Sequence, residues 1–127
     1  MAVDVKYDAD ARLSMKNGID KLADAVRVTL GPKGRNVAFD QKYDVPLVTN
    51  DGVTIAKQVD LDDPYENAGA QIVKQAAIKS NDTVGDGTTA AVLLSQVMIN
   101  AGFKNLVAGA NPVHLKNGLD QALKVAV

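Results

Sequence analysis

The segment that most constrains the fold is residues 88–101, "TTAAVLLSQVMINA", which contains no charged side chain. As a helix it is apolar on almost every side, so other parts of the chain must cover it on several sides. Aromatic residues make up only 4% of the sequence, and alanine, valine and leucine supply most of the apolar side chains. Because this composition favours closely packed helices over a β-sandwich, the sequence predicts a mainly α-helical fold.

The first part of the chain is predicted to form an amphipathic helix. Asp8 or Asp10 can cap its start, and Gly31 followed by Pro32 ends it. Its apolar residues recur at four-three-four spacing, and they are Met15, Ile19, Leu22 and Val26.

Two more helices are predicted from paired start signals. The Asp-Pro pair at 63–64 and the Asn-Pro pair at 111–112 each combine a capping side chain with a first-turn proline. The helix that begins at 63–64 is predicted to run to about Ser80. Gly102 is predicted to cap or bend the end of the apolar helix.

A small amount of β structure is predicted between the first two helices. The segments "NVAFD" and "PLVT" indicate two short strands around a turn at 44–46. After the second strand, Asp51 and Gly52 break the chain. This pair is compatible with a tight hairpin turn, and the following "VTIAKQV" is equally compatible with the start of a short helix.

Charge and composition exclude several classes of partner. The chain is 46% hydrophobic, with 14 basic and 15 acidic residues interspersed along it, so one folded domain without a nucleic-acid or anionic-membrane surface is expected. The absence of cysteine excludes disulfides and thiolate metal sites. Because no secretory signal is present and no apolar run approaches about 20 residues, a cytoplasmic protein with no membrane span is expected.

The loop and helix start at 85–90, "GDGTTA", form a candidate anion site. Unpaired N–H groups at a helix N-terminus, glycines and threonine hydroxyls suit a phosphate. An aspartate beside phosphate would repel it unless a divalent cation lies between them, so Asp86 is interpreted as an Mg²⁺ ligand. The residues alone leave the alternative that Asp86 or a threonine only caps the helix, and this reading is slightly favoured.

Two other segments are candidate parts of a site, and two familiar phosphate motifs are excluded. "TLGPKG" (29–34) is a glycine-proline corner with Lys33 and Arg35 nearby and a candidate part of a site, although an ordinary helix stop is favoured for it alone. In Asn50-Asp51-Gly52 a carboxylate on a tight turn could orient a water, although a plain turn is favoured for this segment alone. "GDGTTA" matches the dinucleotide fingerprint, but no buried strand precedes it. A Rossmann-type dehydrogenase is therefore excluded. A P-loop is excluded because its lysine and hydroxyl residue are missing.

Taken together, these segments resemble one family. "LADAVRVTLGPKGRNVAFD", "VTNDGVTIAKQVDLDDPYENAGAQIVKQAA", "NDTVGDGTTAAVLL" and "AGANPVHLKNGLDQAL" resemble the N-terminal part of a group I chaperonin, the GroEL-type large subunit. The resemblance covers essentially all 127 residues. "TLGPKG" and "GDGTT" are shared across chaperonins, whereas "GRNV" and "ENAGAQ" indicate the bacterial and organellar branch.

The resemblance implies that residues 1–127 are the N-terminal segment of an equatorial, ATP-binding domain, mainly helical with a small β-hairpin. The residues that would line the nucleotide are Thr29, Leu30, Gly31 and Pro32. The residues that would bind phosphate oxygens are Gly87, Thr88, Thr89 and Ala90. Asp86 would coordinate Mg²⁺, Asp51 would lie near the γ-phosphate and position water as the catalytic residue, and Asn50 would lie beside the phosphates.

Two positions depart from the family pattern. Many members have a threonine where this chain has Ala90, and some have a lysine where it has Asn50. ATP binding is still expected, because backbone groups and Mg²⁺ carry most of the phosphate interaction.

The resemblance further implies an ATP-dependent folding chaperone, an ATPase that forms stacked homo-oligomeric rings and binds non-native client proteins and a co-chaperonin. Because the chain stops inside an amphipathic pattern, it is expected to be truncated. The intermediate domain, the apical domain and the C-terminal equatorial part, with the purine and ribose contacts, would lie beyond Val127. The fragment alone is expected to bind nucleotide weakly with negligible turnover. The alternative is a structural or oligomerising fragment without ATP turnover.

Overall fold

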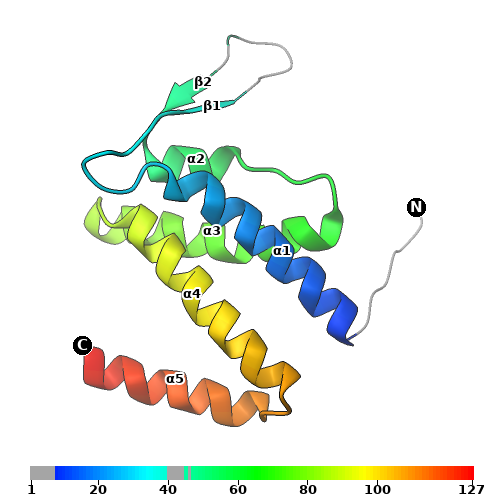
Figure 1. Ribbon diagram of the computed structural model, residues 1–127. Coiled ribbons are helices and arrows are strands. Elements are labelled where there is room, and N and C mark those ends of the chain that lie inside the picture. Colours follow the sequence, from blue (N-terminus) through cyan, green and yellow to red (C-terminus); the bar gives the residue numbers. More distant parts are fainter. Residues whose placement is uncertain (1–7, 40–44, 46) are drawn as a thin grey trace. The chain divides into compact units, whose positions relative to one another are not determined.

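The computed structural model describes residues 8–39, 45 and 47–127 (Figure 1). These residues form five helices and one two-stranded antiparallel sheet, which confirms the predicted mainly α-helical class with a small hairpin. The elements in chain order are α1 (Asp8–Arg27), β1 (Val37–Phe39), β2 (Leu47–Thr49), α2 (Gly52–Gln58), α3 (Pro64–Val84), α4 (Thr88–Val107) and α5 (Pro112–Ala126). The chain divides into two compact units, residues 1–96 and 97–127.

In the first unit, α1 and α3 cross so closely that two glycines are required. A Cβ atom built at Gly18 would overlap the backbone carbonyl of Glu66, and one built at Gly69 would overlap the carbonyl of Met15. Each helix therefore brings its backbone against the other at a glycine. The largest fully buried side chains of this unit are Leu22, Ile55, Val26, Val73 and Val92, which come from α1, α2, α3 and α4.

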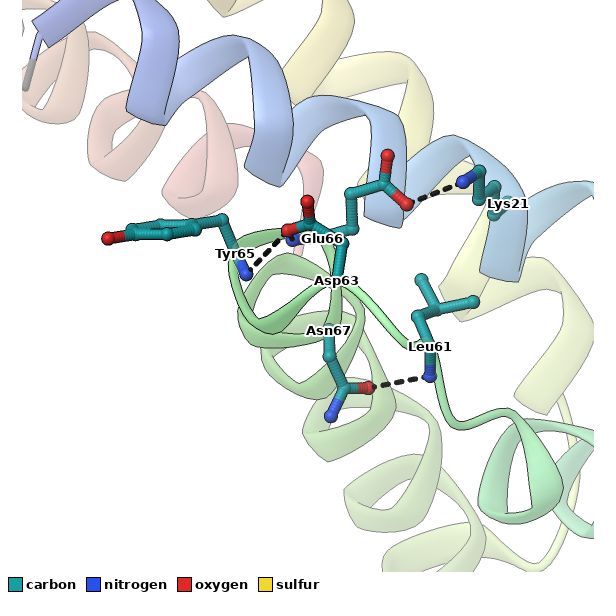
Figure 2. A network of polar contacts seen from close by, with 6 residues as sticks. All are labelled: Lys21, Leu61, Asp63, Tyr65, Glu66 and Asn67. Atoms are coloured by element: carbon teal, nitrogen blue, oxygen red, sulfur yellow. Dashed lines mark hydrogen bonds and ion pairs between the residues drawn. The ribbon is translucent and has the colours of Figure 1, made fainter. Parts of the chain in front are cut away.

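Short-range polar contacts fix the start of α3 (Figure 2). As predicted, Asp63 caps the helix, because its carboxylate accepts hydrogen bonds from the backbone N–H groups of Tyr65 at 2.8 Å and Glu66 at 3.1 Å. The Glu66 side chain then forms an ion pair with Lys21 of α1 at 2.5 Å. The start of α3 is thus joined to the same helix on which its glycine packs.

The β-hairpin has the predicted position. β1 pairs antiparallel with β2, with Val37 opposite Thr49 and Phe39 opposite Leu47. The turn predicted at 44–46 lies largely outside the described residues, of which it includes only Val45. The alternative left open after Asp51 is decided in favour of a short helix, α2.

Three predicted helix ends were wrong. α3 continues past Ser80 to Val84 and stops at Gly85, whose backbone is left-handed with φ +72°. α4 continues through Gly102 to Val107, because Gly102 keeps a helical backbone, and the left-handed residue that follows is Gly109 with φ +99°. α1 ends at Arg27, four residues before Gly31.

The extended α4 also changes the expectation about apolar length. Among the described residues, α4 is the one helix long and apolar enough to cross a membrane, whereas the sequence reading found no run of that length. The difference arises because α4 includes residues 102–107. Only 11% of this apolar stretch is buried in the described structure, so the expectation that other parts of the chain cover the helix on several sides is wrong for the described residues. One helix of this kind is weak evidence for a membrane span, because the core helix of a soluble protein passes the same test.

The second unit contains the end of α4 and all of α5. Asn111 caps α5 as predicted, with its side-chain oxygen 2.9 Å from the Val113 N–H. A Cβ atom at Gly102 would lie 3.4 Å from the Leu115 side chain, so α5 passes close to α4 at this glycine. No residue of α5 is buried, which leaves the apolar side chains of Leu119 and Leu123 exposed.

Candidate functional site

Three segments of the first unit meet at one pocket, with a cavity volume of ≈ 380 Å³. They are the turn after α1, the junction of β2 with α2, and the loop between α3 and α4. The residues that line the pocket are Thr29, Leu30, Gly31, Asn50, Asp51, Gly52, Asn81, Gly85, Asp86, Gly87, Thr88, Thr89 and Ala90.

The pocket contains ten of the eleven site residues predicted from the sequence. Pro32, the eleventh, is exposed in the turn after Gly31 and is not among the lining residues. Two further lining residues, Gly52 and Gly85, lie in the candidate segments 50–52 and 85–90 but were given no role of their own, and sequence reasoning missed Asn81. Asn81 was missed because α3 was predicted to end at Ser80; its position one helical turn before the glycine that stops the helix is the signal that could have identified it.

The start of α4 differs from the starts of α2, α3 and α5. Those three helices are capped by the side chains of Asp51, Asp63 and Asn111. By contrast, the Asp86 carboxylate accepts from the N–H of Gly87 at 2.7 Å, and Gly87 precedes α4. Within the described part of the chain, no side chain accepts a hydrogen bond from the first-turn N–H groups of α4, which therefore remain available to an acceptor at the pocket.

The loop that carries Asp86 has a defined conformation. Gly85 and Gly87 both have left-handed backbones, with φ +72° and +73°, and flank the aspartate. The Ser80 hydroxyl, on the last turns of α3, donates to the Asp86 carbonyl oxygen at 3.0 Å. Asp86, between the two glycines, is exposed and lines the pocket.

Asp51 reaches the pocket as the N-cap of α2. One carboxylate oxygen, Oδ2, accepts from the Thr54 N–H at 3.3 Å and from the Thr54 hydroxyl at 2.5 Å. The Asp51 N–H donates to the Thr49 hydroxyl at 3.1 Å, which links the cap to the end of β2. The other carboxylate oxygen, Oδ1, takes no part in these contacts with the described residues.

The segments are in direct contact where they meet. The hydroxyl oxygens of Thr29 and Thr89 lie 3.2 Å apart. A Cβ atom added to Gly52 would lie 2.5 Å from the Thr89 hydroxyl oxygen and 3.4 Å from its backbone nitrogen. The start of α4 therefore packs against the turn after α1 and the first residue of α2.

The sequence matches the TCP-1/cpn60 chaperonin family over residues 22–127, a range that includes the whole pocket. The chain belongs to this family. Chaperonins assist protein folding in an ATP-dependent way; they bind ATP, hydrolyse it, and form oligomeric rings that act on client proteins.

The charged side chains in the pocket of this chaperonin are acidic, although the pocket is a candidate anion-binding site. Among the described residues, its lining includes two carboxylates, Asp51 and Asp86, but no lysine, arginine or histidine. Backbone N–H groups, the side-chain amides of Asn50 and Asn81 and the hydroxyl of Thr88 are thus the donors that the described lining offers to a phosphate. Because two carboxylates repel an anion, phosphate would need a cation beside it in this pocket.

The side chains present suit one kind of cation. The described residues contain no group of three or more histidine, cysteine or acidic side chains that could enclose a metal ion. Mg²⁺ is commonly bound through one or two carboxylates together with phosphate oxygens and water. The pocket of the chaperonin therefore fits Mg²⁺ that arrives with a nucleotide better than it fits a metal bound by protein ligands alone.

Proposed function

We propose that this chain carries the phosphate- and magnesium-binding part of the ATPase site of a group I chaperonin, within the N-terminal segment of the equatorial domain. The observation that carries the proposal is the meeting of three distant segments, "TLGPKG", "TNDG" and "GDGTT", at one pocket. The group I assignment is supported by "GRNV" and "ENAGAQ", which also favour a co-chaperonin partner.

In the proposed site, the backbone N–H groups of Thr88, Thr89 and Ala90 bind phosphate oxygens at the uncapped start of α4. Asp86 is the protein ligand of Mg²⁺, which neutralises charge on the phosphates when it is bound. Asn50 contributes an uncharged amide beside the phosphates and leaves the positive charge of the site to the metal ion.

Asp51 is the residue proposed to position the attacking water. Its Oδ2 atom is bound to Thr54, so the carboxylate has a fixed orientation and its Oδ1 atom can accept a hydrogen bond from water. Because phosphoryl transfer depends mainly on positioning and charge neutralisation, this arrangement suits ATP hydrolysis once the remaining parts of the site are present.

Calorimetric titration of the 127-residue chain with ATP tests the proposal. We expect weak binding in the presence of Mg²⁺, a loss of most of the binding heat with EDTA or in Asp86→Asn, and no turnover above background. Asp82→Asn, which changes an exposed aspartate on α3 outside the pocket lining, is the matched control and is expected to bind like wild type. Equal binding by Asp86→Asn and wild type would contradict the proposed role of Asp86.

The alternative, an oligomerising fragment without ATP turnover, is favoured by a separate observation. Large apolar side chains are exposed on the last two helices: Leu94, Val97 and Met98 on α4, and Val113, Leu119 and Leu123 on α5. Such surfaces tend to associate. Sedimentation velocity tests this alternative, because a monomer across a wide concentration range would contradict it.

A further inference from the structure

Gln96 is a buried polar residue on α4, and its amide is bound at both ends. Gln96 is only 6% exposed. Its Oε1 atom accepts from the guanidinium of Arg27 at 2.6 Å, and its Nε2 atom donates to Oδ1 of Asp20 at 2.9 Å. Asp20 also accepts from Lys16 through Oδ2 at 2.9 Å. One amide therefore joins α4 to a charged network on α1.

The chemistry of the partners fixes the orientation of this amide. A guanidinium can only donate and a carboxylate can only accept, so the carbonyl end must face Arg27 and the NH₂ end must face Asp20. Both bonds join the buried amide to a charged group in a partly buried place, and charge-assisted hydrogen bonds of this kind are stronger than neutral ones. The connection thus depends on the polarity of the side chain at position 96 as well as on its size.

The spacing of this contact relates it to the pocket. Gln96 lies seven positions after Thr89 (89 to 96), which places both on the same side of α4 about 10 Å apart. Thr89 contacts Thr29, just beyond the end of α1. α4 is consequently held at two places: its start packs against Gly52 and the turn after α1, and Gln96 binds α1 two turns along the helix. A helix attached at one point can pivot, whereas two points fix its direction.

We propose that Gln96 is a positioning residue for the nucleotide: by binding Asp20 and Arg27, it fixes the direction of α4 and so keeps the N–H groups of Thr88 and Thr89 aimed into the pocket. This inference rests on the proposed function of the pocket. Gln96 is not among the residues that line the pocket and acts through the direction of the helix.

The test measures ATP hydrolysis by the intact assembled chaperonin, with the variants Gln96→Glu, Asp20→Asn and the double variant. Gln96→Glu keeps the shape of the side chain but places two carboxylates together. We expect it to raise the ATP concentration at half-maximal rate about tenfold with kcat within about twofold, the pattern of lost binding common to ground and transition states. Asp20→Asn alone should stay within about twofold of wild type, because an amide at position 20 can still present its carbonyl oxygen to Gln96 and the ion pair lost with Lys16 is partly exposed and weak.

The double variant separates this role from general destabilisation. Its amide at position 20 can donate to the carboxylate at position 96, so we expect the half-maximal concentration to return to within about twofold of wild type. Gln75→Glu, the same change at an exposed position of α3, is the matched control and should have no effect. An unchanged half-maximal concentration in Gln96→Glu, or no recovery in the double variant, overturns the proposal.

Two further variants are measured so that every result either supports or overturns the proposal. If Gln96→Glu does not assemble, Gln96→Asn replaces it, because a side chain shorter by one methylene cannot reach both partners; an unchanged half-maximal concentration in that variant overturns the proposal. Asp86→Asn is measured in parallel. If it retains normal nucleotide binding, the proposed function fails and the role of Gln96 fails with it. If it loses binding while Gln96→Glu does not, the positioning role alone fails.

Discussion

The hydroxyl oxygen of Thr29 lies 3.2 Å from that of Thr89, which is sixty positions further along the chain. Thr29 has one hydroxyl proton and donates it to the carbonyl oxygen of Val26 at 2.7 Å. Thr29 is therefore the acceptor in the contact and Thr89 the donor. Because the proton of Thr89 points to Thr29, the donor that Thr89 offers to a bound phosphate is its backbone N–H.

The first prediction follows from this assignment. Thr89→Val removes the hydroxyl but keeps the backbone N–H and a similar volume, so nucleotide affinity should fall by no more than about threefold. Thr89→Ser should equal wild type. Equilibrium titration with ATP and Mg²⁺ measures both affinities. A loss of a hundredfold or more in Thr89→Val, on the order of 3 kcal/mol, would show that the hydroxyl itself binds the phosphate.

Gly52→Ala should lower nucleotide affinity more than Thr89→Val does. The added Cβ would lie 2.5 Å from the Thr89 hydroxyl oxygen and 3.4 Å from its backbone nitrogen, so Thr89 must shift away from both Gly52 and its contact with Thr29. Since Gly52 begins a helix and has no left-handed backbone, alanine is otherwise well suited to the position. We expect the start of α4 to shift and the affinity, measured by the same titration, to fall about tenfold.

The double variant Gly52→Ala/Thr89→Ala tests the cause of that loss. Removing the hydroxyl removes the 2.5 Å contact, so the affinity should recover to nearly that of Thr89→Ala alone. Gly118→Ala, a helical glycine with no atom within 4 Å of the added Cβ, is the control for the substitution itself. If Gly52→Ala binds nucleotide as tightly as wild type, the close contact between α2 and α4 does not limit the site.

We predict that position 85 requires glycine because its backbone is left-handed, and not because a side chain there would collide with neighbouring atoms. It ends α3 with φ +72°, and a Cβ at this position would have no atom within 4 Å. Gly85→Ala should therefore lower the free energy of unfolding by about 1 kcal/mol, the strain of a left-handed alanine. Gly85→Asn should cost less, because asparagine tolerates this conformation. Urea unfolding followed by circular dichroism measures both, and equal stability of Gly85→Ala and wild type would be inconsistent with the left-handed turn.

Features fixed by neighbouring residues could be predicted from the sequence. The caps at Asp63 and Asn111 bond to N–H groups two or three positions away, so a short motif contains all the participants. Helix ends were harder to predict. Gly85 and Gly102 look alike in the sequence, but Gly85 stops a helix and Gly102 lies within one, close to Leu115 of α5. Which glycine adopts a left-handed backbone depends on packing that the sequence pattern does not contain.

The pocket itself could not be predicted from spacing. Thr29, Asp51 and Asp86 each had an ordinary structural explanation, and the sequence brought them together only through the resemblance to chaperonins. Asp51 does cap a helix, so the ordinary explanation and a place in the pocket are both correct for this residue. The contacts of Gln96 were also inaccessible, because a buried glutamine in an apolar helix gives no indication that its partners are charged residues far away in the sequence.

The crossing of α1 and α3 leads to a last prediction, about stability. A Cβ at Gly69 would overlap the carbonyl group of Met15, and backbone atoms cannot turn aside as a side chain does. Gly69→Ala must therefore separate the two helices, although alanine favours a helix more than glycine does. We expect the free energy of unfolding to fall by about 1–3 kcal/mol, the usual range for overpacking.

Ala68→Ser is the matched control for this substitution. It adds one atom at the neighbouring, exposed position of the same helix, and its free energy of unfolding should stay within about 0.5 kcal/mol of wild type. Urea unfolding of the two variants and wild type makes the comparison. The Lys21–Glu66 ion pair should weaken along with the crossing in Gly69→Ala, because it joins the same two helices one turn away. A Gly69→Ala variant as stable as wild type would mean that the two backbones do not approach each other at this glycine.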